Sequence, residues 1–264
     1  MKPKLLFFDI DGTLLTEDTL IIPESTKRAL KEAQRNGHIT FINTGRPFVS
    51  VDKFIKDLNF DGYICGCGTF VMYKDKVLLY NKLDTKECKK LVKKLREYNI
   101  DGILEGHTEL YYDTDENINS DYVKSIKKRH IETNLYKGKT FDEEDIQFDK
   151  LTIFGDENSN FDDLKKDFED VFEFIYRGEY FYELVPHAFS KASGIKFLED
   201  TLKIPHENTY AFGDSSNDLS MLEYAANSVA MGSGNKDLFD KVSFVTKDIN
   251  EDGIEYALKH YNII

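Results

Sequence analysis

Tryptophan is absent from the 264 residues, and only three cysteines are present. Without tryptophan, bulky packing falls to 20 phenylalanines and 15 tyrosines. The cysteines, Cys65, Cys67 and Cys88, are odd in number and contain no Cys-x-x-Cys pair, so neither a disulfide framework nor a cysteine zinc site is expected. The six histidines contain no His-x-x-x-His pair, and we expect surface or packing roles for them.

Positive charge is also scarce: the chain has 35 Lys and Arg but 48 Asp and Glu, which gives a formal net charge of −13. Nucleic acids and anionic membrane surfaces would repel such a chain, so we expect neither as a partner. Basic runs at 86–96 and 124–129 alternate with apolar residues at helical spacing, which is typical of a solvated helix face. No apolar run is long enough for a membrane span or a signal peptide, and a reduced cytoplasmic setting is the expectation.

Strand and helix patterns alternate at both ends of the chain, which is long enough for one large domain or two moderate ones. The expected strands are 4–8, 38–42, 62–65, 209–212, 227–230 and 242–245, with a hairpin of 69–73 and 77–80. The expected helices run from Pro23 to a Gly37 cap, from Pro47 through 58, and over 193–202 and 253–260. This alternation predicts an α/β fold with a parallel sheet and helices on both faces.

Residues 83–185 differ in character, because they are highly charged and place several strands in succession. The expected helices are 85–98, 119–130 and 160–168, and the expected strands are 100–104, 109–112, 150–154, 172–176 and 180–185. Adjacent strands favour a separate antiparallel or mixed sheet, so we interpret 83–185 as a domain inserted between 1–82 and 186–264. The acidic run 113–117 is similar to a calcium loop, but Ile118 stands where glycine is needed, and a solvated loop is expected.

The first strand ends in two aspartates, Asp9 and Asp11, followed by Gly12 and Thr13. A buried strand that delivers two carboxylates to its carboxyl end forms an acidic cradle where open α/β sheets bind ligands. A calcium loop would need further oxygen ligands and a closing glutamate, which the following Leu14 and Leu15 do not supply. Catalysis and plain turn chemistry remain as the two interpretations of this stretch alone.

Four polar elements follow expected strand ends or precede expected helices, and together they indicate a phosphoryl-transfer site. They are Asp9 with Asp11, Thr44-Gly45-Arg46, Lys191, and Asp214 with Asn217 and Asp218. A phosphoryl group beside carboxylates needs a bridging divalent cation, for which Mg²⁺ is suited. Asp9 and Asp214 would bind the metal directly, and Asn217 or Asp218 would support them.

The same elements supply the reacting groups. The Thr44 hydroxyl, the Gly45 amide and the Lys191 ammonium can hold the remaining phosphate oxygens. Asp9 would attack phosphorus and form an aspartyl-phosphate, while Asp11 would protonate the leaving alcohol and then deprotonate water.

These motifs resemble the haloacid dehalogenase superfamily: Asp9-Ile-Asp11-Gly12-Thr13, Thr44-Gly45-Arg46, Lys191, and Gly213-Asp214-Ser215-Ser216-Asn217-Asp218. The run 229–234, the run 250–253 and the large insert are similar to its Cof-type branch of small-molecule phosphatases. The resemblance implies a Rossmann-like parallel-sheet core, a mobile α/β cap that sets substrate specificity, Mg²⁺ dependence and phosphomonoester hydrolysis. It also implies that the Asp11 backbone carbonyl binds the metal and that Asn217 contributes to phosphate binding.

Two departures from the family pattern concern small residues. Lys191-Ala192 stands where Lys-Gly is common, a tolerable change, and Cys67-Gly68-Thr69 stands where Asn-Gly-Ala is frequent. The second departure puts a substrate contact from the asparagine position in doubt, but leaves the chemistry unaffected. We interpret Cys67 as a small buried residue.

Other functions share parts of this pattern. A dinucleotide-binding enzyme would need a glycine fingerprint after the first strand, and 232–234 comes too late. A receiver domain would not need the insert, and a P-type pump would need membrane helices. A phosphosugar mutase remains the alternative enzyme, and a non-catalytic phospholigand sensor remains the alternative outside enzymes.

The substrate would be a small phosphorylated metabolite whose leaving group the cap surrounds. Candidate cap contacts are 105–107, Tyr111, Tyr112, Arg177 and 180–183, which would suit a sugar phosphate or a phosphorylated cofactor, although core packing is preferred for most of the tyrosines. Arg46 is a candidate substrate contact, with a salt bridge in the core domain as the alternative. We expect a monomer or a weak homodimer.

Overall fold

The computed structural model describes residues 2–264 and divides the chain into two compact units. The first unit comprises Met1–Gly45, Asp52–Leu79 and Phe189–Ile264. The second comprises Arg46–Val51 and Tyr80–Ala188. The sequence placed the domain boundaries at 82 and 186 and did not single out 46–51, which the structure groups with the insert.

The first unit is built on an eight-stranded sheet in the order β13-β12-β11-β1-β2-β3-β4-β5. Its strands are β1 (Leu5–Phe8), β2 (Ile39–Asn43), β3 (Gly62–Cys65), β4 (Phe70–Tyr73), β5 (Lys76–Tyr80), β11 (Thr209–Gly213), β12 (Asn227–Ala230) and β13 (Phe244–Val245). Strands β13 through β3 pair in parallel, and β4 returns antiparallel to β3. The expected α/β core with a parallel sheet is therefore confirmed, and the hairpin that was also expected lies at one edge.

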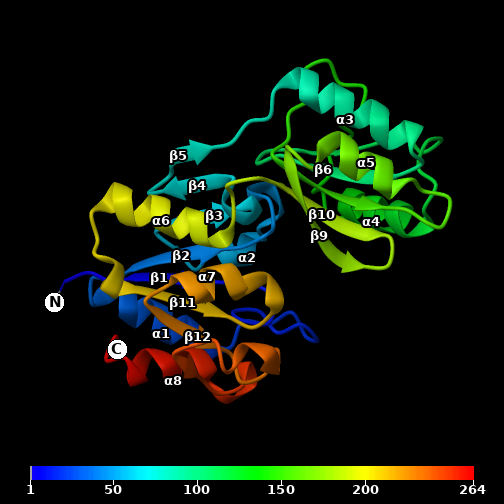
Figure 1. Cartoon of the computed structure of the whole chain (residues 1–264). Helices are drawn as coiled ribbons and strands as arrows, with labels where there is room; N and C mark the ends of the chain where they lie inside the picture. Colours follow the sequence, from blue (N-terminus) through cyan, green and yellow to red (C-terminus); the bar gives the residue numbers. More distant parts are fainter. Residues whose placement is uncertain (1) are drawn as a thin grey trace. The chain divides into compact units, whose positions relative to one another are not determined.

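Helices cover both faces of this sheet because its central strand is apolar on both sides (Figure 1). All four residues of β1 are fully buried. Leu5 and Phe7 pack in a cluster with residues of α6 (Lys191–Leu202) and α7 (Leu219–Tyr224). On the other face α1 (Glu24–Arg35) packs against α8 (Gly253–His260). Such burial on two faces is the usual pattern of parallel strands.

Turn residues end several elements where the sequence indicated. Helix α1 follows Pro23 and is closed by Gly37, whose φ is +84°. Lys74 and Asp75, with φ of 48° and 61°, form the tight β4–β5 turn, as hairpins with two left-handed central residues require. β3 and α8 have the predicted bounds.

The single helix expected from Pro47 through residue 58 is wrong. The chain instead forms a 3₁₀ turn at Phe48–Ser50, passes through an extended Val51 (φ −75°, ψ 117°), and then forms the short α2 (Lys53–Lys56). Val51 is buried, and its extended backbone breaks the apolar spacing that had suggested one continuous helix. The break coincides with the boundary between the two units.

The second unit is an antiparallel five-stranded sheet in the order β7-β6-β8-β10-β9. Its elements are α3 (Thr85–Glu97), β6 (Asp101–Glu105), β7 (Leu110–Tyr112), α4 (Asp121–Glu132), β8 (Lys150–Phe154), α5 (Phe161–Phe168), β9 (Phe172–Gly178) and β10 (Phe181–Pro186). One face packs on α3 and α5, and the other packs in part on α4. Of the two arrangements expected for the insert, an antiparallel or a mixed sheet, the structure has the antiparallel one.

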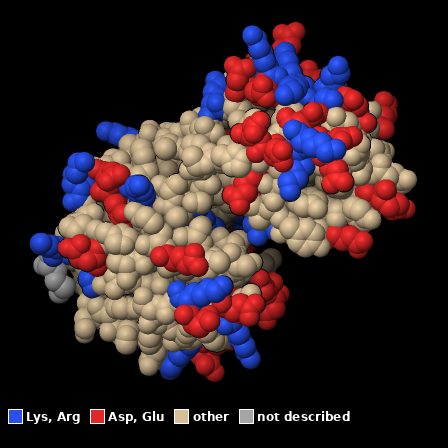
Figure 2. All heavy atoms as spheres, viewed as in Figure 1, with Lys and Arg blue, Asp and Glu red and all other residues tan. Residues whose placement is uncertain are grey.

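Most charged side chains of the second unit lie on the surface, but several are buried, among them Asp113 and a group on the sheet. On α3, Cys88, Leu91 and Leu95 are buried while the lysines face outward, and the face shown in Figure 2 carries both signs of charge interspersed. The loop after β7 is only partly solvated, contrary to expectation, because Asp113 is buried and accepts hydrogen bonds from Arg96 at 2.6 and 2.7 Å. No helix among residues 2–264 has the length and apolar character needed to cross a membrane.

The second buried group of charges lies on the sheet of this unit. The Lys150 ammonium is 2.5 Å from Glu183 Oε1 and 3.1 Å from Glu105 Oε2, and Arg177 donates to Glu183 Oε2. Although burial opposes ionisation, the two cations lower the pKa of Glu183 to about 2. Tyr111 and Tyr112, also considered as cap contacts, are buried in the cores of this unit.

Candidate active site

Two of the predicted carboxylates follow neighbouring strands of the first unit. β1 pairs in parallel with β11, with Phe8 opposite Phe212, and the Asp9 N–H donates to the Phe212 carbonyl at 3.0 Å. Asp9 and Asp214 therefore follow adjacent strand ends at the same edge of the sheet. This is the edge where open α/β sheets bind their ligands.

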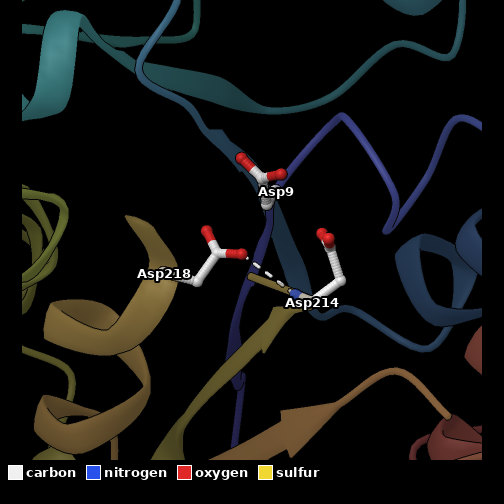
Figure 3. A group of neighbouring side chains, drawn as sticks. All are labelled: Asp9, Asp214 and Asp218. Atoms are coloured by element: carbon white, nitrogen blue, oxygen red, sulfur yellow. Dashed lines mark hydrogen bonds between the residues drawn. The ribbon is translucent and has the colours of Figure 1, made fainter. Parts of the chain in front are cut away.

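A third carboxylate joins them through the turn after β11. Asp218 ends a 3₁₀ turn at Ser216–Asp218, and its Oδ2 accepts the backbone N–H groups of Asp214 and Ser215 at 2.9 and 3.1 Å. Carboxylate oxygens of Asp9, Asp214 and Asp218 all lie within 4.8 Å of one another, and all three residues are buried (Figure 3). The structure thus forms a compact acidic cluster from segments near opposite ends of the chain.

One cation lies within this cluster. Lys191, the first residue of α6, places its ammonium 2.5 Å from Asp9 Oδ1 and 2.6 Å from Asp218 Oδ1. Its side chain is almost completely buried. α6 begins two residues earlier than the sequence predicted, at Lys191 itself. Ser190 caps this helix start in a reciprocal capping box with Ser193.

The cluster holds more negative than positive charge, and this imbalance shifts the pKa values of its groups. Burial, followed by repulsion from Asp218, raises the pKa of Asp9 to about 8, although the Lys191 ammonium opposes the rise. Burial and Asp218 likewise raise the pKa of Asp214 to about 7. The pKa of Lys191 rises because the two carboxylates outweigh its own desolvation. Three carboxylates sharing one ammonium leave a site in which a further cation would be stabilised.

Two residues of the first motif, Gly12 and Thr13, shape the surroundings of Asp214, a role that the sequence interpretation did not give them. The Thr13 hydroxyl donates to Asp214 Oδ1 at 2.8 Å. Gly12 has φ of +79°, and a Cβ at this position would lie 2.4 Å from Asp214 Oδ2. The glycine is therefore required both by its backbone conformation and by the carboxylate beside it. The signal was in the motif, since both residues directly follow Asp11.

The remaining predicted residues lie in segments near the same strand ends or in a separate unit. Thr44 directly follows β2, the other neighbour of β1, and is buried. Gly45 ends this segment of the first unit, whereas Arg46 belongs to the second unit. Asn217 is exposed, and its Oδ1 accepts the Ser215 hydroxyl at 2.7 Å. Asp11 is half-buried in the turn after β1, where it bridges to Leu15.

A family model described as haloacid dehalogenase-like hydrolase matches residues 6–258. The chain belongs to this family. YkrA of Bacillus subtilis (strain 168), which carries a provisional phosphatase name, is 34% identical over the full length of both chains. The 5-amino-6-(5-phospho-D-ribitylamino)uracil phosphatase YwtE of the same organism is 27% identical over 97% of this chain and 96% of its own.

Two solved structures have the same fold as this chain. The sugar phosphatase BT4131, of subclass IIB, aligns with a TM-score of 0.81 and 30% identity over 99% of this chain and 100% of its own. A protein from Geobacillus kaustophilus HTA426 aligns with a TM-score of 0.86 and 24% identity over 99% of this chain and 100% of its own, which shows the fold. The chain is thus a Cof-type haloacid dehalogenase-like hydrolase, and the prediction that it is a phosphatase is confirmed.

Proposed function

We propose that the enzyme hydrolyses phosphomonoesters of small metabolites with Mg²⁺ through an aspartyl-phosphate on Asp9. The observation that carries this proposal is the buried cluster of Asp9, Asp214 and Asp218 with the Lys191 ammonium between two of its carboxylates. A buried nucleophile, a metal-binding pair and a phosphate-binding cation are the parts that phosphoryl transfer needs in one place.

The donor set fits Mg²⁺, because it consists of hard carboxylate oxygens and carries excess negative charge. Oδ1 of Asp9 accepts from Lys191 and Oδ1 of Asp214 accepts from Thr13, and both carboxylates would hold the metal. The Asp11 backbone carbonyl would be the third protein ligand. Asp218 would hold the metal ligands in place and would not bind the metal itself, because both of its oxygens accept hydrogen bonds from the protein. When bound, the metal supplies charge neutralisation for the phosphate oxygens.

The reaction divides between the first two aspartates. An Asp9 carboxylate oxygen forms a bond to phosphorus as the bond to the ester oxygen breaks, and Asp11 gives the leaving alcohol its proton. In the second step Asp11 takes a proton from water, whose oxygen attacks phosphorus and releases Asp9 and inorganic phosphate. Thr44, Gly45, Lys191 and Asn217 would hold the phosphate oxygens. Arg46 is retained as a candidate contact to the substrate.

The proposed substrates are sugar phosphates or phosphorylated cofactors. BT4131 is a sugar phosphatase, and YwtE acts on a phosphoribitylamino-uracil, so both relatives take a phosphorylated polyol or sugar. The insert at 83–185 would act as the cap that selects the leaving group, as the family resemblance implies. We also propose that the enzyme works in the cytoplasm as a monomer or weak homodimer.

Phosphate release from a panel of phosphomonoesters tests the proposal. The panel covers sugar phosphates, nucleotides, FMN and pyridoxal phosphate, each with Mg²⁺ and with EDTA, and Asp9→Asn is the control. Metal-dependent release that the variant loses supports the proposal. Release that persists in EDTA or in Asp9→Asn contradicts the metal or the nucleophile, respectively. No release by folded protein would favour a mutase or a phospholigand sensor.

A further inference from the structure

Asn43 is a buried polar residue that neither the sequence motifs nor the proposed reaction employs. It is the last residue of β2, directly before Thr44, and its exposed fraction is 0%. Its side-chain amide donates to the backbone carbonyl of Lys191 at 3.0 Å, across 148 positions of sequence. One side chain thus joins the segment of Thr44 to the first residue of α6.

The carbonyl that Asn43 contacts belongs to the residue whose ammonium lies in the acidic cluster. Lys191 reaches Asp9 and Asp218 at 2.5 and 2.6 Å, so the position of its backbone determines where its ammonium can lie. A lysine side chain is flexible, and a fixed backbone reduces the number of orientations from which it reaches both carboxylates. The Asn43 hydrogen bond therefore fixes the backbone from which the phosphate-binding Lys191 side chain extends.

The turn after β3 lies against the same two segments. The Cys67 N–H donates to the Thr44 carbonyl at 3.3 Å. Gly68 has φ of +95°, and a Cβ there would lie 2.3 Å from the carbonyl oxygen of Ser190, so only glycine permits this approach. The segments of Thr44 and Lys191 therefore both lie close to the backbone of this turn.

The chemistry of Asn43 explains why an asparagine stands there. Its Oδ1 is buried and has no hydrogen-bond partner among residues 2–264. An unpartnered buried oxygen is unfavourable, and leucine would fill a similar volume without it. The amide group is therefore retained for its donor, which acts on Lys191.

We propose that Asn43 is a positioning residue for phosphoryl transfer, acting through the Lys191 backbone. The inference rests on the proposed function. Asn43→Leu removes the donor at similar volume, and we expect kcat to fall about 10- to 100-fold, because a small displacement of a catalytic cation is costly. KM should change less than about threefold, since Thr44 and the metal ligands stay in place.

Thr209→Val is the matched control. Thr209 is also fully buried and donates one hydrogen bond, to Glu199 Oε1 at 2.6 Å, but it lies at the opposite, amino end of β11. Both variants lose one buried hydrogen bond, and thermal unfolding reports the stability that each retains. Only Asn43→Leu should lose turnover. If it fails to fold, Asn43→Ser is measured in its place, because its hydroxyl is too short to reach Lys191.

A double-mutant cycle with Lys191→Met separates positioning from general destabilisation. If Asn43 acts through Lys191, Asn43→Leu should cause no further loss in the Lys191→Met background. Where turnover is too slow, the same cycle is measured by calorimetry on the affinity for orthovanadate, which mimics the phosphoryl group in transfer. Unchanged kcat in Asn43→Leu, or additive losses in the cycle, would overturn the inference. An inactive wild-type enzyme would instead contradict the proposed function, so the two failures are distinguishable.

Discussion

Replacing Asp9 with asparagine should stabilise the metal-free enzyme while abolishing its turnover. The pKa of Asp9 is raised from 3.8 to about 8 in the folded protein, so the folded state binds this proton more tightly than the unfolded chain. Stability is therefore lost as the pH rises from about 4 to about 8, and it levels off above that. The asparagine side chain of the variant carries no charge in either state and escapes this loss.

The size of the stability gain in Asp9→Asn follows from the difference between the two pKa values of Asp9, in the folded and in the unfolded chain. A shift of about four pKa units corresponds to at most about 6 kcal/mol, at about 1.4 kcal/mol for each unit. Relaxation of the site and entry of water reduce this ceiling, and we expect a gain of about 2–3 kcal/mol for Asp9→Asn at pH 8. The gain should be close to zero at pH 4.

Urea unfolding at pH 5, 6.5 and 8 in EDTA measures the effect, followed by the same series with Mg²⁺. Saturating Mg²⁺ should stabilise the wild type more than the variant, by about 2.7 kcal/mol at a hundredfold excess over Kd, because the cation binds only the folded carboxylates. A variant that is no more stable than the wild type at pH 8 in EDTA would refute the reasoning. A difference that is equal at pH 5 and pH 8 would refute it as well.

Three further predictions concern other carboxylates. Glu183→Gln should have the opposite pH dependence: the pKa of Glu183 is lowered to about 2, so the variant should lose about 3 kcal/mol at pH 7 and progressively less in urea titrations below pH 4. Asp11→Asn should lose about 10²- to 10⁴-fold in kcat with alkyl esters but much less with p-nitrophenyl phosphate, and an equal loss with both would exclude an acid role. Asp214→Ala should raise the Mg²⁺ concentration for half-maximal activity at least about tenfold, and an unchanged metal titration would remove Asp214 from the ligand set.

The alternating strands and helices could be predicted because apolar periodicity and turn residues act over short distances. β3 and α8 have the predicted bounds, and the insert was recognised from its charge and its consecutive strands. The helix expected after Pro47 failed because Val51 is extended and buried, which depends on packing that the local pattern does not contain.

The sequence by itself determined which residues form the candidate site. Carboxylates, a threonine and a lysine placed after strands or before helices have the same chemistry whatever the details of the packing around them. Only the tertiary structure decided how they meet. The pairing of β1 with β11 brings Asp9 to Asp214, and the start of α6 brings Lys191 to both Asp9 and Asp218. The contact of Asn43 with Lys191 spans 148 positions and was invisible to any local pattern. Long-range packing sets such contacts, since it brings together segments whose sequences carry no record of one another.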